Sequence, residues 1–92
     1  MRLDITFRQI DASDEIRQWV ERRVEKVARF LRPPIEVHVV LREEKHRQIA
    51  EVTVKAAGEG PYVASAESED IRTSIDLVMQ KIESSVRRAH DR

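Results

Sequence analysis

Cysteine is absent from this 92-residue chain. Without thiols the chain has no disulfide framework, no thiolate metal site and no cysteine nucleophile. No apolar run approaches the ~20 residues that a membrane-spanning helix needs. The opening residues MRLDITFRQ also lack the apolar region of a secretory signal. We therefore expect a cytoplasmic protein without a membrane segment.

The common signatures of catalysis and metal binding are missing as well. The sequence contains no His-x-x-x-His pair, no glycine-rich loop that cradles phosphate and no nucleophile elbow. The three histidines, His38, His46 and His90, lie far apart and lack the spacing of metal ligands. We therefore expect no enzymatic activity, no metal site and no cofactor.

The chain also lacks a net charge, because seventeen basic side chains balance seventeen acidic ones. A zero total argues against a generic binder of nucleic acid, since such domains are usually strongly basic. Binding to phosphate depends on local clustering, however, so the positions of the charges matter more than their sum. The length of the chain predicts one domain, residues 1–92, with one modest core.

Four segments alternate apolar and polar side chains with the period of two that is typical of half-buried strands. They are residues 3–7, 35–41, 52–56 and 62–66. Residues 42–48 are expected to form a charged hairpin loop, and Gly58, Gly60 and Pro61 mark a turn.

Two segments follow the helical period instead. In the first, apolar residues from 16 to 31 form a narrow stripe that Trp19 and Phe30 widen. Ser13 is its expected N-cap, and the Pro33–Pro34 pair is expected to end it. Trp19 borders charged residues, where an indole can stack on a nucleobase or lie at the edge of the core. The sequence favours the core edge.

The last segment, residues 65–92, is the longest uninterrupted periodic stretch of the chain. Its apolar seam runs from Ile71 to Ala89, and Ser68 is the expected N-cap. Leu77 lies off this seam, so it is expected to be exposed or packed at an edge.

The order of these segments predicts an α+β fold of the type β-α-β-β-β-α. Short loops join the last three strands, which should form an antiparallel meander. A helix joins the first strand to the second, so these two can pair in parallel. Because each strand has one apolar face, the simplest arrangement is a four-stranded sheet with two helices packed on one face.

Both helices separate basic from acidic side chains around their axes. The basic flanks are Arg22, Arg23, Lys26 and Arg29 on the first helix and Lys81, Arg88 and Arg92 on the last. The separation has the same rotational sense in both helices. The flanks would therefore meet between antiparallel helices and point the same way on parallel ones, which the sequence leaves open. A solvated helix face is the alternative to a binding surface, although selection for helix stability alone would interleave the signs.

Taken together, the segments resemble the ribosome hibernation promoting factor and ribosome-associated inhibitor A family, once called sigma-54 modulation proteins. The resemblance rests on LDIT, DEIRQWVERRVEKVARF, VHVVLREEK, and ASAESEDIRTSID with the following QKI. It covers nearly the whole chain. It implies the β-α-β-β-β-α fold already derived and a single ribosome-binding domain over residues 1–92.

Members of that family bind the small ribosomal subunit over the sites for mRNA and the A- and P-site tRNAs. They block translation and store ribosomes under stress or in stationary phase. The resemblance therefore implies rRNA as the partner, with a ribosome modulation factor as a further partner in paired ribosomes. No DNA or membrane partner is expected.

The resemblance also implies which cations bind rRNA. Family basic positions are matched by Arg17, Arg23, Lys26, Lys45, Lys81, Arg88 and Arg92. With the other flank residues and Arg87, the predicted rRNA-binding set is Arg17, Arg22, Arg23, Lys26, Arg29, Lys45, Lys81, Arg87, Arg88 and Arg92. These side chains would replace counterions around phosphates without reading the base sequence.

The chain departs from the family pattern in its last helix. Ser84 stands at a commonly basic position, Arg72 replaces a frequent tyrosine, and the lysine-rich C-terminal run is thinned to RRAHDR. These changes lower the expected affinity unless Arg72 and Arg87 compensate. The chain can be a complete short factor or the N-terminal domain of a long one. A general double-stranded RNA-binding module and a protein-interaction domain that modulates a sigma factor are the alternative functions.

Overall fold

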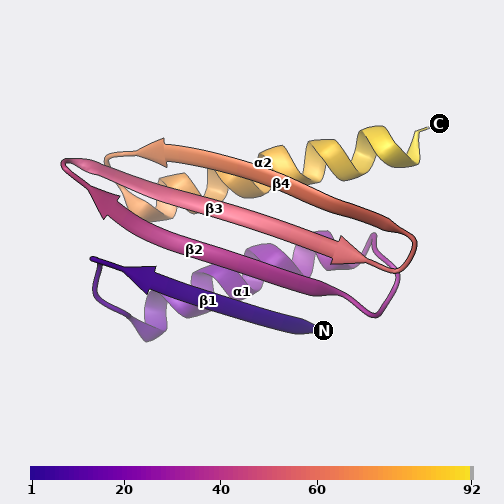
Figure 1. The fold of residues 1–92 in the computed structure, drawn as a ribbon, viewed down its shortest axis with the longest axis horizontal. Helices are drawn as coiled ribbons and strands as arrows, with labels where there is room; N and C mark the ends of the chain where they lie inside the picture. Colours follow the sequence, from indigo (N-terminus) through magenta and orange to yellow (C-terminus); the bar gives the residue numbers. More distant parts are fainter. Residues whose placement is uncertain (92) are drawn as a thin grey trace.

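The computed structural model describes residues 1–91 of the chain. The strands form one sheet in the order β1-β2-β3-β4, and both helices lie on the same side of it (Figure 1). The predicted α+β architecture is therefore confirmed. The elements are β1 (Arg2–Arg8), α1 (Asp14–Ala28), β2 (Glu36–Glu44), β3 (Arg47–Ala56), β4 (Glu59–Ser68) and α2 (Ile71–His90).

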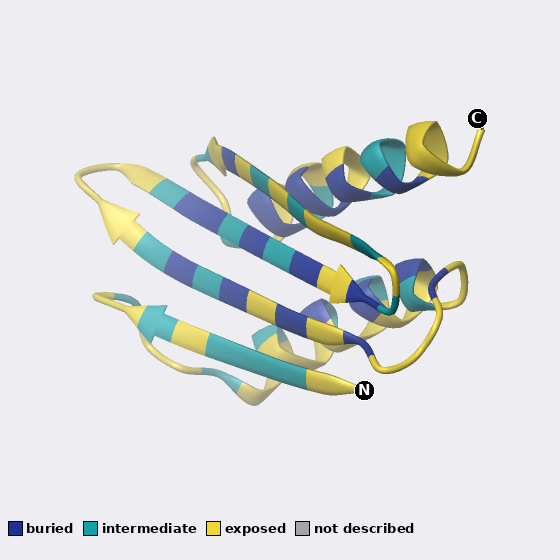
Figure 2. Ribbon diagram, turned by 45° about the vertical axis from the view of Figure 1, so that its right-hand side comes forward, coloured by how far each residue is buried: buried dark blue, intermediate teal, exposed yellow. Residues whose placement is uncertain are grey.

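Strand pairing follows the connections between the strands. The helical crossover makes β1 parallel to β2, and the hairpins make β2, β3 and β4 an antiparallel meander. In the centre of the sheet Val39 lies opposite Val52 and Leu41 opposite Ala50, and all four side chains are buried. Because side chains alternate along a strand, one face of the sheet packs against the helices and the other is open (Figure 2).

The hydrophobic core lies between the helices and the sheet. Val24 of α1 and Ile75 and Ile82 of α2 are each 1% exposed or less, and they pack with the buried face of the strands. Complete burial of such a side chain stabilises the fold by about 1.5–3 kcal/mol. No helix among residues 1–91 is both long and apolar enough to cross a bilayer.

The start of α1 agrees with the sequence. The Ser13 hydroxyl accepts a hydrogen bond from the Ile16 N–H at 3.3 Å, which satisfies one of the unpaired donors of the first turn. The apolar stripe buries Val20, Val24 and Val27. Ser13 is therefore confirmed as the N-cap.

The end of α1 differs from the sequence-based expectation. The helix ends at Ala28, well before the proline pair, and the Phe30 N–H donates to the Val27 carbonyl in a tighter turn. Leu31 then turns inward and is buried. Phe30 was predicted to widen the apolar stripe, and this was wrong, because the backbone has already left the helical path. Its side chain is 62% exposed.

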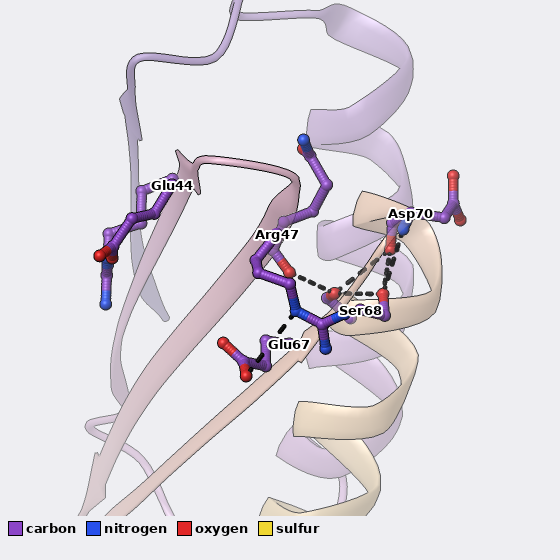
Figure 3. A network of polar contacts seen from close by, with 8 residues as sticks. Glu44, Arg47, Glu67, Ser68 and Asp70 are labelled. Carbon is purple, nitrogen blue, oxygen red and sulfur yellow. Dashed lines mark hydrogen bonds and ion pairs between the residues drawn. The ribbon is translucent and has the colours of Figure 1, made fainter.

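The start of α2 also differs from the prediction that Ser68 is its N-cap. Asp70, not Ser68, is the N-cap, since its carboxylate accepts from the Thr73 N–H at 3.0 Å. Ser68 ends β4, and its hydroxyl lies 2.6 Å from the Ser74 hydroxyl (Figure 3). Ser74 is completely buried and donates to the Gln48 carbonyl at 2.6 Å. These contacts attach the first turn of α2 to β3 and fix the rotation of the helix on the sheet.

The predicted hairpin loop at residues 42–48 is mostly strand. Strand β2 continues to Glu44 and β3 begins at Arg47, so only Lys45 and His46 form the turn. A run of charged residues can lie on the solvent side of two paired strands as well as in a loop, and the sequence pattern does not separate the two.

Candidate nucleic-acid interface

The two helices run parallel across the sheet (Figure 1). Glu15 in the first turn of α1 pairs with Arg72 in the first turn of α2 at 3.1 Å. Further along, Arg23 pairs with Asp76 at 2.7 Å. The basic flanks of the helices therefore point the same way and do not meet, so they form two separate surfaces.

The first surface is a groove between the helices, which we call the inner groove. Here the basic flank of α1 faces the acidic flank of α2, so charges of opposite sign face each other across the groove. The hollow has a volume of about 310 Å³. Its lining residues are Arg23, Lys26, Val27, Asp76, Met79, Gln80 and Glu83.

Asp76 is the centre of the contacts beside the inner groove. Its Oδ1 accepts from the Trp19 Nε1–H at 2.9 Å and from the Arg23 Nε–H at 2.7 Å. The guanidinium carbons of Arg22, Arg23 and Arg72 lie 5.9, 4.5 and 5.4 Å from the centre of the Trp19 ring. The indole is thus held by cations on its ring and by a carboxylate at its N–H. The prediction that Trp19 lies at the edge of the core is confirmed.

The second surface lies between α2 and the edge strand β4, and we call it the outer groove. Its volume is about 660 Å³. Among residues 1–91, none of the side chains that line it is acidic. The lining residues are Val63, Ala64, Ser65, Leu77, Gln80, Lys81, Ser84, Ser85 and Arg88.

The two cations of the outer groove contact neutral oxygens. The Lys81 ammonium donates to the Ser65 carbonyl at 2.6 Å, and Arg88 donates to the Ser85 hydroxyl at 3.3 Å. The Lys81 contact is to a backbone carbonyl of β4, which is an edge strand of the sheet. A carbonyl or hydroxyl dipole orients a cation without cancelling its charge, so this groove keeps a positive potential that suits an anionic partner.

The C-terminal end of α2 is attached to the sheet by a third polar cluster. The Glu59 carboxylate accepts from the Tyr62 hydroxyl at 2.6 Å and lies 2.8 Å from His90 Nε2. The bond from Tyr62, with that from His90, lowers the pKa of Glu59. The same bond raises the pKa of Tyr62 to about 12. Within residues 1–91 no group of three or more histidine or acidic side chains is placed to hold a metal ion.

Comparison with known proteins agrees with this arrangement. The family model described as Sigma 54 modulation protein / S30EA ribosomal protein matches residues 3–92. The chain belongs to this family.

Curated and solved relatives give the same assignment. A ribosome hibernation promoting factor from Azotobacter vinelandii is 32% identical over 83 residues, which cover 90% of this chain and 77% of that protein. One from Salmonella typhimurium is 29% identical over 92 residues, covering 100% and 96%. A ribosomal subunit interface protein from Coxiella burnetii superposes over the full length of both chains with a TM-score of 0.85 at 25% identity. The N-terminal domain of Thermus thermophilus Protein Y gives 0.85 at 25% identity, over 96% of this chain and 98% of that one.

Membership of the S30EA family supports a ribosome-associated role in hibernation and translation regulation. The family is one of non-enzymatic factors, which agrees with the prediction that the chain is not an enzyme.

Several members of the predicted rRNA-binding set lie outside both grooves. Arg22 and Arg29 are exposed on α1, with Arg29 at the C-cap. The guanidinium of Arg17 lies 5.0 Å from the centre of the Phe7 ring, on the side of α1 near β1. Lys45 is exposed at the tip of the β2–β3 hairpin. The structure therefore brings together only some of the cations that the resemblance to the S30EA family implies.

In the last turns of α2 the predicted cations differ in their surroundings. Arg87 pairs with Glu83 at 2.7 Å, whereas Arg88 faces the outer groove. Ser84, the departure from the family pattern, lines the same groove between Lys81 and Arg88. Arg92 lies outside the described residues.

Sequence reasoning missed the hydrogen-bonding groups that hold these cations. Ser65 belongs to β4, and its place opposite Lys81 depends on how α2 lies on the sheet. Ser85 had a usable signal, because it lies one turn before Arg88 on the same helix. Arg72 was noted only as a departure from the family, although it contacts both Glu15 and the Trp19 ring.

Proposed function

We propose that this protein binds the small ribosomal subunit in the channel for mRNA and the A- and P-site tRNAs, and so inhibits translation. The observation that supports this most is the outer groove, whose lining among residues 1–91 holds Lys81 and Arg88 on neutral oxygens and no acidic side chain. Membership of the S30EA family names the ribosome as the polyanion. The outcome is a stored, inactive ribosome under stress or in stationary phase.

The mechanism is steric occlusion and includes no bond-making step. Lysine and arginine side chains replace counterions around rRNA phosphates, which gives affinity and register. Folded rRNA is recognised by its shape, so specificity comes from the fit of a rigid domain into the channel. The paired charges of the inner groove limit binding to unrelated RNA, which explains how a chain of zero net charge serves this function.

The proposed function also implies a cellular location and a set of partners. Residues 1–92 act as one ribosome-binding domain in the cytoplasm, with the small subunit as the main partner. In paired ribosomes a ribosome modulation factor is a further partner. Membranes and DNA are not partners.

A displacement experiment tests this function. Purified small subunits carrying labelled mRNA and initiator tRNA are titrated with the protein, and release of each label is followed together with translation in a reconstituted system. We expect both labels to be released as translation stops. Binding to subunits without release would contradict the proposed site. Competition by free duplex RNA would favour the general RNA-binding module, and binding that survives RNase treatment would favour a protein partner.

A further inference from the structure

Four aromatic side chains occur in the chain, and three of them are already engaged. A guanidinium lies 5.0 Å from the centre of the Phe7 ring, and the Tyr62 hydroxyl donates to a carboxylate. Trp19 has three guanidinium groups near its ring and a hydrogen bond at its N–H. Phe30 is the exception, since no cation lies over its ring among residues 1–91 and it is 62% exposed.

The exposure of Phe30 follows from how α1 ends. After Ala28 the backbone makes a tight turn that directs Leu31 into the core, where it is 8% exposed. Adjacent side chains in this turn cannot both reach the core. Phe30 therefore points outward from a backbone that its neighbours hold in place. Because its ring is exposed, we expect substitution of Phe30 to cost little folding stability.

The Phe30 ring borders a small hollow at the end of the inner groove. Two buried valines, each 3% exposed, form its apolar base, and an ion pair of 2.7 Å between α2 side chains forms its wall. The volume is about 100 Å³. The lining residues are Val27, Phe30, Glu83, Val86 and Arg87.

Two exposed cations lie close to Phe30 along the chain. Lys26 lies one turn before Phe30 and Arg29 directly before it, and both are exposed. The inner groove is continuous with the hollow, because Val27 and Glu83 line both. An open aromatic face beside basic side chains is the arrangement by which proteins bind single-stranded nucleic acid, with bases on the ring and phosphates on the cations.

We propose that Phe30 stacks on an unpaired RNA base, while Lys26 and Arg29 contact the phosphates on either side of it. This inference rests on the proposed ribosomal function, which supplies the RNA. It assigns a contact just after the end of α1, and this contact depends on an aromatic ring and not on charge. It also assigns base stacking to Phe30 and not to Trp19, whose ring is already covered.

The test compares Phe30→Leu, which keeps an apolar side chain, with Phe30→Tyr, which keeps an aromatic face. Affinity for purified small subunits is measured over a range of salt. Phe30→Leu should weaken binding by about fivefold to a hundredfold, the range expected for loss of one stacked base. Its salt slope should equal that of the unmodified protein, because stacking releases no counterions. Phe30→Tyr should bind within about twofold of the unmodified protein, since an aromatic face is retained. Equal binding by Phe30→Leu, or equal losses in both variants, would overturn the proposal.

A second probe separates this inference from the ribosomal function. A single-stranded oligoribonucleotide containing 2-aminopurine reports stacking through loss of fluorescence. Quenching by the unmodified protein but not by Phe30→Leu supports the inference even if small subunits are not bound. A loss of subunit binding in Phe30→Leu without any difference in quenching would mean that Phe30 contacts a ribosomal protein, and would overturn the inference alone. No quenching and no subunit binding would overturn both proposals.

Discussion

The inner and outer grooves contain the same kinds of cation but differ in what surrounds them. In the inner groove Arg23 lies 2.7 Å from Asp76, and Glu83 belongs to the same wall. In the outer groove Lys81 and Arg88 contact a backbone carbonyl and a hydroxyl. The first arrangement joins two helices, and the second leaves charge available to a partner.

This difference has a geometric cause. The helices share one rotational order of basic, apolar and acidic side chains, and they lie parallel. The basic flank of α1 therefore faces the acidic flank of α2. The basic flank of α2 has no third helix beside it, only the edge strand β4. The same sequence pattern thus places Arg23 of α1 in an ion pair, whereas it leaves Lys81 and Arg88 of α2 on neutral oxygens as a candidate binding surface.

Reversing the charges of the outer groove should have the largest effect. We expect Lys81→Glu with Arg88→Glu to lower affinity for small subunits by about a hundredfold or more at low salt, because two phosphate contacts become repulsive. The matched control is Arg8→Glu with Lys55→Glu, which makes the same change in charge at exposed strand positions. A sedimentation-binding assay decides between them. Equal losses in both double variants would remove the special role of the outer groove.

The second-largest effect is expected from substitution of Ser74, the buried serine that orients α2 between the grooves. Ser74→Ala removes the donor to the Gln48 carbonyl and is expected to reduce the free energy of unfolding by about 1–3 kcal/mol. Ser84→Ala is the control, with an expected change within about 0.5 kcal/mol. Urea unfolding measures both. Similar values for the two variants would mean that Ser74 does not anchor the helix.

A smaller effect is expected in the inner groove. Asp76→Ala removes the acceptor of both Trp19 and Arg23, and because the site is partly exposed we expect a loss of about 1 kcal/mol in unfolding free energy. Affinity for small subunits should stay equal or rise, since a negative charge has been removed from the surface. A loss of affinity like that of the outer-groove variant would show that both grooves bind RNA in the same way.

The smallest effect concerns the end of α2 and depends on pH. Because the pKa of Glu59 is lowered in the folded protein, its contribution to stability is fully present above pH 4.5, the ordinary pKa of the group. The contribution is lost as the pH falls through the lower pKa of the folded state. The pKa of Tyr62 is raised, so its contribution to stability is fully present below pH 10 and is lost as the pH rises through about 12. Glu59→Gln should flatten the acid side of the stability profile in urea unfolding. An unchanged acid profile would mean that this cluster does not hold the helix.

Most of the fold could be predicted from the sequence, because period two and period 3.6 are strong along this chain. Ser13 capped α1 as expected. The errors lie at boundaries: Phe30 follows the helical spacing although the helix ends at Ala28, and Ser68 and Asp70 are both good caps. Choosing between two caps that lie two residues apart requires knowing where β4 ends, which is set by its pairing with β3.

The candidate site was predictable only in part. The helical projection gave the basic flanks, with Lys81 and Arg88 on one side of α2. It could not show whether the helices are parallel, and that relation decides which flank meets acids. It also could not show that the Ser65 carbonyl lies beside Lys81, because strand and helix are placed together only by the core.

The most direct test of this account compares Arg23→Gln with Arg88→Gln. Each variant removes one guanidinium charge, from the inner and the outer groove respectively. The slope of log affinity for small subunits against log salt is measured for both. Arg88→Gln should give a slope shallower by about 0.7, the share of one phosphate contact, and Arg23→Gln should leave the slope unchanged. A slope reduced equally or more by Arg23→Gln would contradict the claim that charge pairing separates the two grooves.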